Sequence, residues 1–183
     1  MFQNLPVMKK IILLLASLLV LVSCENKTET LATCYRDIHY FANASSECSV
    51  KIINGWADYL IDWYEDGRQL FNDGFIDVFD KIVAETDWDG INETMQSVDS
   101  TLNKRYPSKY KSIRDDLFRL YNIARQLRTH ARKVDYDYLH SHDVREYRKE
   151  YYELCDKYNE AMENFESRHP EIVGQLHSLD ELY

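Results

Sequence analysis

The sequence predicts an all-α fold: an up-down antiparallel helical bundle of about five helices that ends in a long coiled-coil-like helical hairpin. Two observations predict it. Glycine and proline are scarce, because between Gly90 and Gly174 there is no glycine and there are only two prolines, Pro107 and Pro170. Strand-rich domains need more frequent turns. Apolar residues also recur every three or four positions over long stretches, which is the period of a helix.

The hairpin is the clearest predicted element. Its first series of apolar positions starts after Pro107, a favourable residue for the first turn of a helix, and its second starts at Val144. The two series are out of phase across residues 140–143, where Ser141 can cap a new helix. We therefore expect two antiparallel arms, with Pro170 ending the second. The series are Tyr110, Ile113, Leu117, Leu120, Ala124, Leu127, Ala131, Val134 and Tyr138, then Val144, Tyr147, Tyr151, Leu154, Tyr158, Ala161 and Phe165.

Three further helices are expected upstream, with less regular spacing. The first covers about residues 31–44 and is followed by a turn near Ser45. The second covers residues 46–84, with a kink or break at Gly67 or at residues 72–74. A turn at residues 87–90 precedes a shorter helix that ends near Tyr106. The count is five helices, or six if the second one breaks.

The N-terminus has the pattern of a secretory signal peptide. Lys9 and Lys10 precede an apolar run over residues 11–22 that only Ser17 interrupts. A short basic region followed by about a dozen apolar residues is typical of such a peptide. The run is too short to cross a bilayer as a helix, which needs roughly 20 apolar residues.

The end of this run, Leu21-Val22-Ser23-Cys24, resembles the lipobox of bacterial lipoproteins. The resemblance covers residues 8–24 and implies that residues 1–23 are removed, with cleavage between Ser23 and Cys24. It also implies that Cys24 receives a diacylglyceryl group, and two or more acyl chains anchor a protein stably. Residues 24–30 then form a lipidated tether, and residues 31–183 a single domain. In enteric lipoproteins an Asp after the cysteine implies inner-membrane retention. Glu25 stands here instead, and the outer membrane is favoured over the outer face of the cytoplasmic membrane.

Composition excludes some partners. Residues 24–183 carry 20 basic and 31 acidic side chains, a net charge of −11. Nucleic-acid binding relies on surfaces rich in Lys and Arg, so no nucleic-acid partner is expected. An acidic surface also opposes lying flat on anionic lipid.

Three cysteines remain once Cys24 is lipidated: Cys34, Cys48 and Cys155. Export permits a disulfide, and the sequence does not separate the three possible pairings. Three buried, reduced thiols are the alternative.

One segment offers metal ligands. Asp137, His140, His142 and Asp143 lie within seven residues, and His-x-His can present two imidazoles to zinc or copper. The alternative is a solvated turn between the two arms of the hairpin, because the spacing of these ligands is loose. No cofactor is expected.

The 14 tyrosines and three tryptophans are the most unusual feature of the composition. Trp56 and Trp63 share a helix face, and many tyrosines occupy heptad core positions. They can fill the core, or form an aromatic groove for a peptide or a glycan. The tyrosines outside those core positions are the better candidates for exposure: Tyr59, Tyr64, Tyr121 and Tyr152.

These features favour a non-enzymatic role. The sequence contains no Gly-rich phosphate loop, G-x-S-x-G, H-E-x-x-H or EF-hand loop. We expect a membrane-anchored envelope lipoprotein, a binding or scaffolding module that contacts another envelope protein through a helical face. The alternative is a metal- or small-ligand-binding bundle that uses the His140/His142 segment.

Overall fold

The computed structural model describes residues 27–66, 80–134, 138 and 144–180, and every regular element in them is helical. The α-helices are α2 (Lys27–Asp66), α4 (Trp88–Leu102), α5 (Lys111–Arg132), α7 (Val144–Arg168) and α8 (Pro170–Asp180). A short 3₁₀ helix, η1 (Ser108–Tyr110), precedes α5, and residues 80–85 are also helical. The predicted all-α bundle is confirmed.

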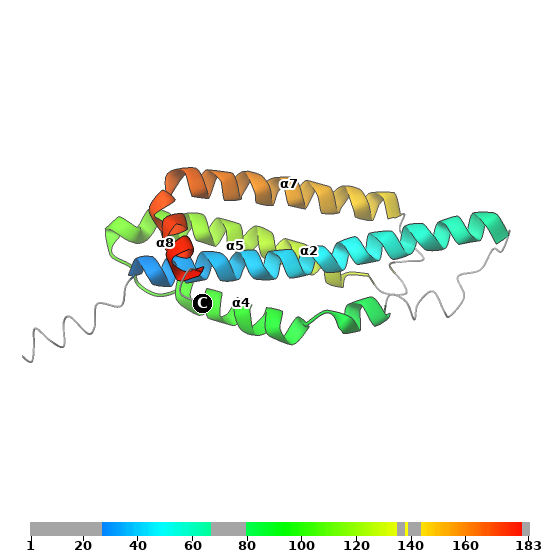
Figure 1. Cartoon of the computed structure of the whole chain (residues 1–183), viewed down its shortest axis with the longest axis horizontal. Coiled ribbons are helices and arrows are strands. Elements are labelled where there is room, and N and C mark those ends of the chain that lie inside the picture. The colour runs from blue at the N-terminus through cyan, green and yellow to red at the C-terminus, as the bar shows by residue number, and fades with distance from the viewer. Residues whose placement is uncertain (1–26, 67–79, 135–137, 139–143, 181–183) are drawn as a thin grey trace, which may run out of the picture.

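The four long helices alternate in direction along the chain. In Figure 1, α2 and α5 run one way, while α4 and α7 run the other way. The two parallel helices, α2 and α5, pack against each other along the middle of the molecule, with α4 on one side and α7 on the other. The short helix α8 crosses the end of the bundle where α2 begins, and packs against α2 and α7.

The N-terminal part of the chain differs from the two helices expected over residues 31–44 and 46–84. Residues 27–66 form one continuous helix, so the turn predicted near Ser45 is wrong. Ser45 and Ser49 are fully buried among helices, together with Phe41, Ile52 and other apolar residues of α2. Serine is acceptable inside a helix when tertiary contacts outweigh its weak propensity. The helix ends at Asp66, and the break predicted at Gly67 or residues 72–74 lies outside the described residues.

The predicted hairpin agrees well with α5 and α7. The expected core positions of both arms are buried, except for Tyr110, Tyr138 and Leu154, which are partly buried. The first arm ends at Arg132, earlier than expected. Tyr121 was expected to be exposed and is buried instead, because α5 contacts α4 as well as α2 and α7 and therefore buries a wide face. Tyr152 is 56% exposed, as expected.

Helix α8 was not predicted. Pro170 does end α7, but it also begins a new helix, where its missing N–H group costs nothing. Ile172 of α8 is fully buried against the bundle. His169, just before α8, places its Nε2 2.8 Å from Asp116 Oδ2 of α5, and Arg168 Nη1 is 2.8 Å from the same oxygen. These contacts fix the turn between α7 and α8 to the start of α5.

Helix α4 begins at a side-chain cap. Residues 87–90 were predicted to be a turn, and they are the N-cap Asp87 and the first residues of the helix. The Asp87 carboxylate accepts a hydrogen bond of 2.9 Å from the Gly90 amide. A Cβ atom at position 90 would collide with this carboxylate, so a side chain there would displace the cap.

One core runs through the described part of the bundle. Its largest fully buried side chains come from all five α-helices: Phe41, Leu31, Ile38, Ile52, Ile91, Leu102, Leu117, Leu120, Leu127, Tyr147, Phe165 and Ile172. Aromatic contacts join helices across it. Tyr35 stacks on Phe165 with ring centroids 4.8 Å apart, and Phe41 meets Tyr121 edge-on. Among the described helices, none is long and apolar enough to cross a membrane.

Candidate functional site

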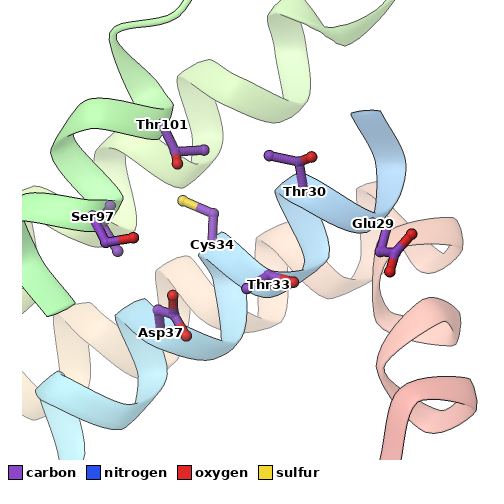
Figure 2. Close-up of a pocket in the computed structure, with 8 residues that line it drawn as sticks. Glu29, Thr30, Thr33, Cys34, Asp37, Ser97 and Thr101 are labelled. Carbon is purple, nitrogen blue, oxygen red and sulfur yellow. The ribbon is translucent and has the colours of Figure 1, made fainter. Parts of the chain in front are cut away.

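A groove of about 380 Å³ lies between the first turns of α2 and the last turns of α4. Figure 2 shows its polar lining, in which the Cys34 thiol of α2 points toward Ser97 and Thr101 of α4. The lining consists of short polar side chains with one valine: Glu29, Thr30, Thr33, Cys34, Asp37, Ser97, Val98 and Thr101. Helical spacing explains this set, because residues 30, 33, 34 and 37 share one face of α2.

The thiol in this groove is a weak nucleophile. Burial, together with the negative charge of Asp37, raises the pKa of Cys34 to about 12. Reactive cysteines are thiolates with a lowered pKa, so Cys34 remains a protonated thiol at neutral pH. Burial also raises the pKa of Asp37, and the neighbouring Arg36 opposes that rise. None of the described residues that line the groove is a histidine or a lysine. Its hydroxyl and carboxylate groups suit hydrogen bonding to a polar segment rather than bond cleavage.

A second hollow, of about 220 Å³, lies between α2 and α7. It is lined by His39, Ala42, Asn43, Ser46, Leu127, Cys155, Tyr158 and Asn159. The Tyr158 hydroxyl lies 3.4 Å from His39 Nδ1, and the Ser46 and Tyr151 hydroxyls are 2.5 Å apart. His39, Ser46 and Tyr158 of this hollow therefore already have hydrogen-bond partners.

A serine and a histidine also meet in the core, where α2, α5 and α7 come together. Ser49 Oγ is 3.2 Å from His130 Nδ1, and His130 Nε2 is 3.0 Å from the Tyr147 carbonyl oxygen. A catalytic serine needs a substrate beside it, whereas Ser49 is fully buried and lines neither hollow. Burial lowers the pKa of His130 to about 4, and the charge of Lys133 adds to this effect. The cluster is a neutral polar contact between three helices.

The predicted metal ligands Asp137, His140, His142 and Asp143 lie outside the described residues, and the same is true of Ser23 and Cys24. Within the described residues, no group of three or more His, Cys, Asp or Glu side chains could hold a metal ion. Metal binding at the His140/His142 segment stays a prediction.

The three cysteines that were candidates for a disulfide are all free. Cys34 and Cys48 are buried on one side of α2, and Cys155 is half-buried on α7. Cys34 and Cys48 are 14 residues apart on a continuous helix, which separates them by about 21 Å along the axis. A disulfide requires Cα atoms within about 7 Å, so this pair cannot form one in the folded protein.

Sequence reasoning did not find the groove. Its residues come from two separate stretches of the sequence, 29–37 and 97–101, and most of them are common polar residues without a motif. Trp56, one of the expected aromatic pair, is buried in the core. The side chains of Tyr59, Trp63 and Tyr64 lie outside the described part of the structure.

Comparison of the chain with protein-family models, with curated proteins and with solved structures gives no match.

Proposed function

We propose that this chain is a lipid-anchored envelope lipoprotein of the outer membrane and a non-catalytic binding or scaffolding module. In this proposal it contacts another envelope protein through a helical face. The observation that carries the proposal is the lipobox at residues 21–24, which follows a basic and then apolar leader. Only Glu25 and Asn26 separate Cys24 from the first residue of α2. The anchor would therefore hold the bundle close to the bilayer.

The chemistry of the described hollows supports binding rather than catalysis. The α2/α4 groove contains a protonated thiol and hydroxyl groups, and the buried Ser49–His130 contact is away from both hollows. Large apolar side chains are exposed on three different helices. They include Tyr40 of α2 at 52%, Phe118 of α5 at 39% and Tyr152 of α7 at 56%. Exposed aromatic residues are enriched in protein interfaces.

The anchor is tested by replacing its cysteine. Cys24→Ala is expected to lose labelling with an alkyne analogue of palmitate and to leave the membrane fraction. Cys155→Ala is the matched control, because it also removes one thiol and should keep both the label and the membrane location. A Cys24→Ala protein that keeps its label and stays with the membrane would contradict the proposal.

The partner is tested by photo-crosslinking in living cells. Benzoylphenylalanine, which is close in shape to an aromatic side chain, replaces Tyr40, Phe118 or Tyr152 in separate variants. Because each variant probes a different helix, the expected result is a recurrent adduct with one envelope protein at one of these positions. The same variants without irradiation are the control. No recurrent adduct at any of the three positions would contradict a protein-binding role.

A further inference from the structure

Three arginines lie on the side of α5 that faces α4. Arg125, Arg128 and Arg132 are spaced three and four residues apart, which places them on one face of the helix. Arg128 and Arg132 approach the same indole ring, with guanidinium carbons 6.0 Å and 5.3 Å from the centre of Trp88. The guanidinium carbon of Arg125 is 5.7 Å from the ring centre of Tyr121.

The aromatic partner of these arginines is held in place. The Trp88 indole N–H donates a hydrogen bond of 2.7 Å to the Val83 carbonyl oxygen, and Trp88 begins α4 directly after the Asp87 cap. Arg128 donates a hydrogen bond of 2.5 Å to Asn92 of α4. These contacts order the cationic side chains before any ligand arrives, which lowers the entropic cost of binding.

No carboxylate in the described residues neutralises the three arginines. Ion pairs within 4.0 Å form at Arg114, Lys133 and Arg168, but not at Arg125, Arg128 or Arg132. The buried Nε atom of Arg128 has no hydrogen-bond partner. Burial lowers the pKa of Arg128, and the positive charges of Arg132 and Arg125 lower it further. The three cations therefore repel each other and would be stabilised by an added anion.

This cluster belongs to the one basic part of an acidic protein. Residues 103–134 contain ten basic and two acidic side chains, whereas the rest of residues 24–183 contains ten basic and 29 acidic side chains. Opposite charges on two proteins accelerate their association and select the correct partner. An acidic partner would be repelled by most of this molecule and attracted to this segment.

The composition of the cluster indicates which class of anion fits. A guanidinium group pairs with a carboxylate through two parallel hydrogen bonds. Arg125 and Arg132 are seven residues apart, about 10 Å along α5, which suits several carboxylates along a chain better than one small ion. Arginine, tryptophan and tyrosine are also the residues most enriched at the energetic centres of protein interfaces. Phe118, 39% exposed, extends the aromatic surface through its edge-on contact with Tyr121.

We propose that Arg125, Arg128 and Arg132, together with Trp88, form the surface that binds a carboxylate-rich segment of the partner protein. This inference rests on the proposed function and names the face of the bundle that performs it.

The first test measures binding of a synthetic peptide of ten glutamates to the full chain, purified in a neutral detergent, by isothermal titration calorimetry at low salt. The triple variant Arg125→Gln/Arg128→Gln/Arg132→Gln is expected to bind at least about tenfold more weakly than the wild type, because it loses three charge-assisted contacts. The triple variant Lys109→Gln/Lys111→Gln/Arg119→Gln removes the same charge from exposed positions of the same segment and should bind within about twofold of the wild type. Circular dichroism shows whether each variant retains its helices.

Equal binding by the wild type and the arginine variant would overturn the inference, as would no binding by the wild type. Inorganic phosphate and vesicles with anionic lipid are tested in parallel. Arginine-dependent binding of either one in place of the peptide would overturn the choice of a carboxylate-rich protein segment.

The second test separates this inference from the proposed function. Photo-crosslinking through position 118 should give an adduct that disappears in the triple arginine variant. The adduct should persist in the control variant Lys109→Gln/Lys111→Gln/Arg119→Gln. A recurrent adduct at position 40 or 152 but not at 118 would leave the proposed function standing and overturn the arginine surface. No adduct at any of the three positions would contradict the proposed function itself.

Discussion

His130 is a side chain whose environment differs sharply from water. It is buried between α2, α5 and α7, with Ser49 at one ring nitrogen and the Tyr147 carbonyl at the other. The Tyr147 ring lies against it, with ring centroids 3.9 Å apart. Because burial lowers the pKa of His130 to about 4, the imidazole is neutral in the folded protein at neutral pH.

This shift makes stability depend on pH. The folded pKa is about 4 and the ordinary value is 6.5, so between these values the unfolded chain binds the proton more readily. The contribution of neutral His130 is therefore complete above pH 6.5 and is lost as the pH falls toward 4. We expect the free energy of unfolding to fall by about 1 to 2 kcal/mol from pH 7 to pH 5 because of this residue.

The measurement is urea denaturation of the wild type and of His130→Gln at both pH values. The glutamine variant is less stable at pH 7, but it should lack this part of the pH dependence. Identical slopes of stability against pH in the two proteins would contradict the assignment.

Ser45 is a residue whose replacement should help the fold. Its side chain is fully buried inside α2, and its hydroxyl has no hydrogen-bond partner. Ser45→Ala removes a buried unpaired polar group and introduces the residue with the best helix propensity. We expect the variant to be more stable by about 0.5 to 1 kcal/mol, measured as a higher urea midpoint. Ser49→Ala is the contrast, because it removes the partner of His130 and should lower the midpoint.

At the scale of elements, α2 is where sequence reasoning failed most clearly. The turn was predicted near Ser45, between two separate helices that were expected over residues 31–44 and 46–84. The helix continues because Phe41, Ile52 and Trp56 on both sides of this point pack into one core with α5 and α7. Tertiary packing overrides local propensity here, and packing partners more than 70 residues away cannot be read from a local window.

A proline introduced into α2 tests whether the helix is continuous or has a turn near Ser45. Glu47 is exposed and its carboxylate pairs with Lys51 at 2.9 Å. Glu47→Pro is expected to lower the free energy of unfolding by about 3 kcal/mol or more, because proline removes a helix hydrogen bond and clashes with the preceding turn. Glu47→Ala loses only an exposed ion pair and should change stability by about 0.5 kcal/mol or less. Equal midpoints for the two variants in urea denaturation would indicate a turn near this position.

The hairpin was predicted well because its signal is local. The three-and-four spacing of α5 and α7 corresponds directly to the side chains that are buried, from Ile113 to Val134 and from Val144 to Phe165. The error at Tyr121 arose because a heptad stripe describes contact with one partner, while α5 contacts three long helices. Helix α8 was missed since it is short and contains both Pro170 and Gly174.

At the scale of the whole molecule, the described hollows and charged surfaces form only where particular helices pack side by side. The groove is lined by residues of α2 and α4, and the arginine surface combines residues of α5 with Trp88 of α4. The sequence alone shows which residues are polar, but not which helices become neighbours. The proposed lipobox is different, because a motif of this kind is recognised as a linear sequence and its prediction requires no knowledge of which helices pack together.

The cysteines give a test of the assembled molecule. All three cysteines in the described residues are free, two of them buried. We therefore expect alkylation of the denatured chain to modify Cys34, Cys48 and Cys155 equally with and without a reductant, measured by mass spectrometry. Fewer alkylated cysteines without the reductant would show a disulfide. Without denaturant, Cys155 should react first because it is the least buried of the three.

The packing of α2 against α7 and α8 has a consequence for how the protein folds. The Tyr35 hydroxyl donates a hydrogen bond of 2.7 Å to Glu166, which is 131 residues later in the sequence, and α8 covers the same part of α2. Loops of this length close slowly compared with the formation of single helices. The part of the apolar face of α2 that packs against α7 and α8 thus stays uncovered until these last two helices have been synthesised. A chain truncated after α5 would expose that face, which makes it a candidate for chaperone binding or proteolysis.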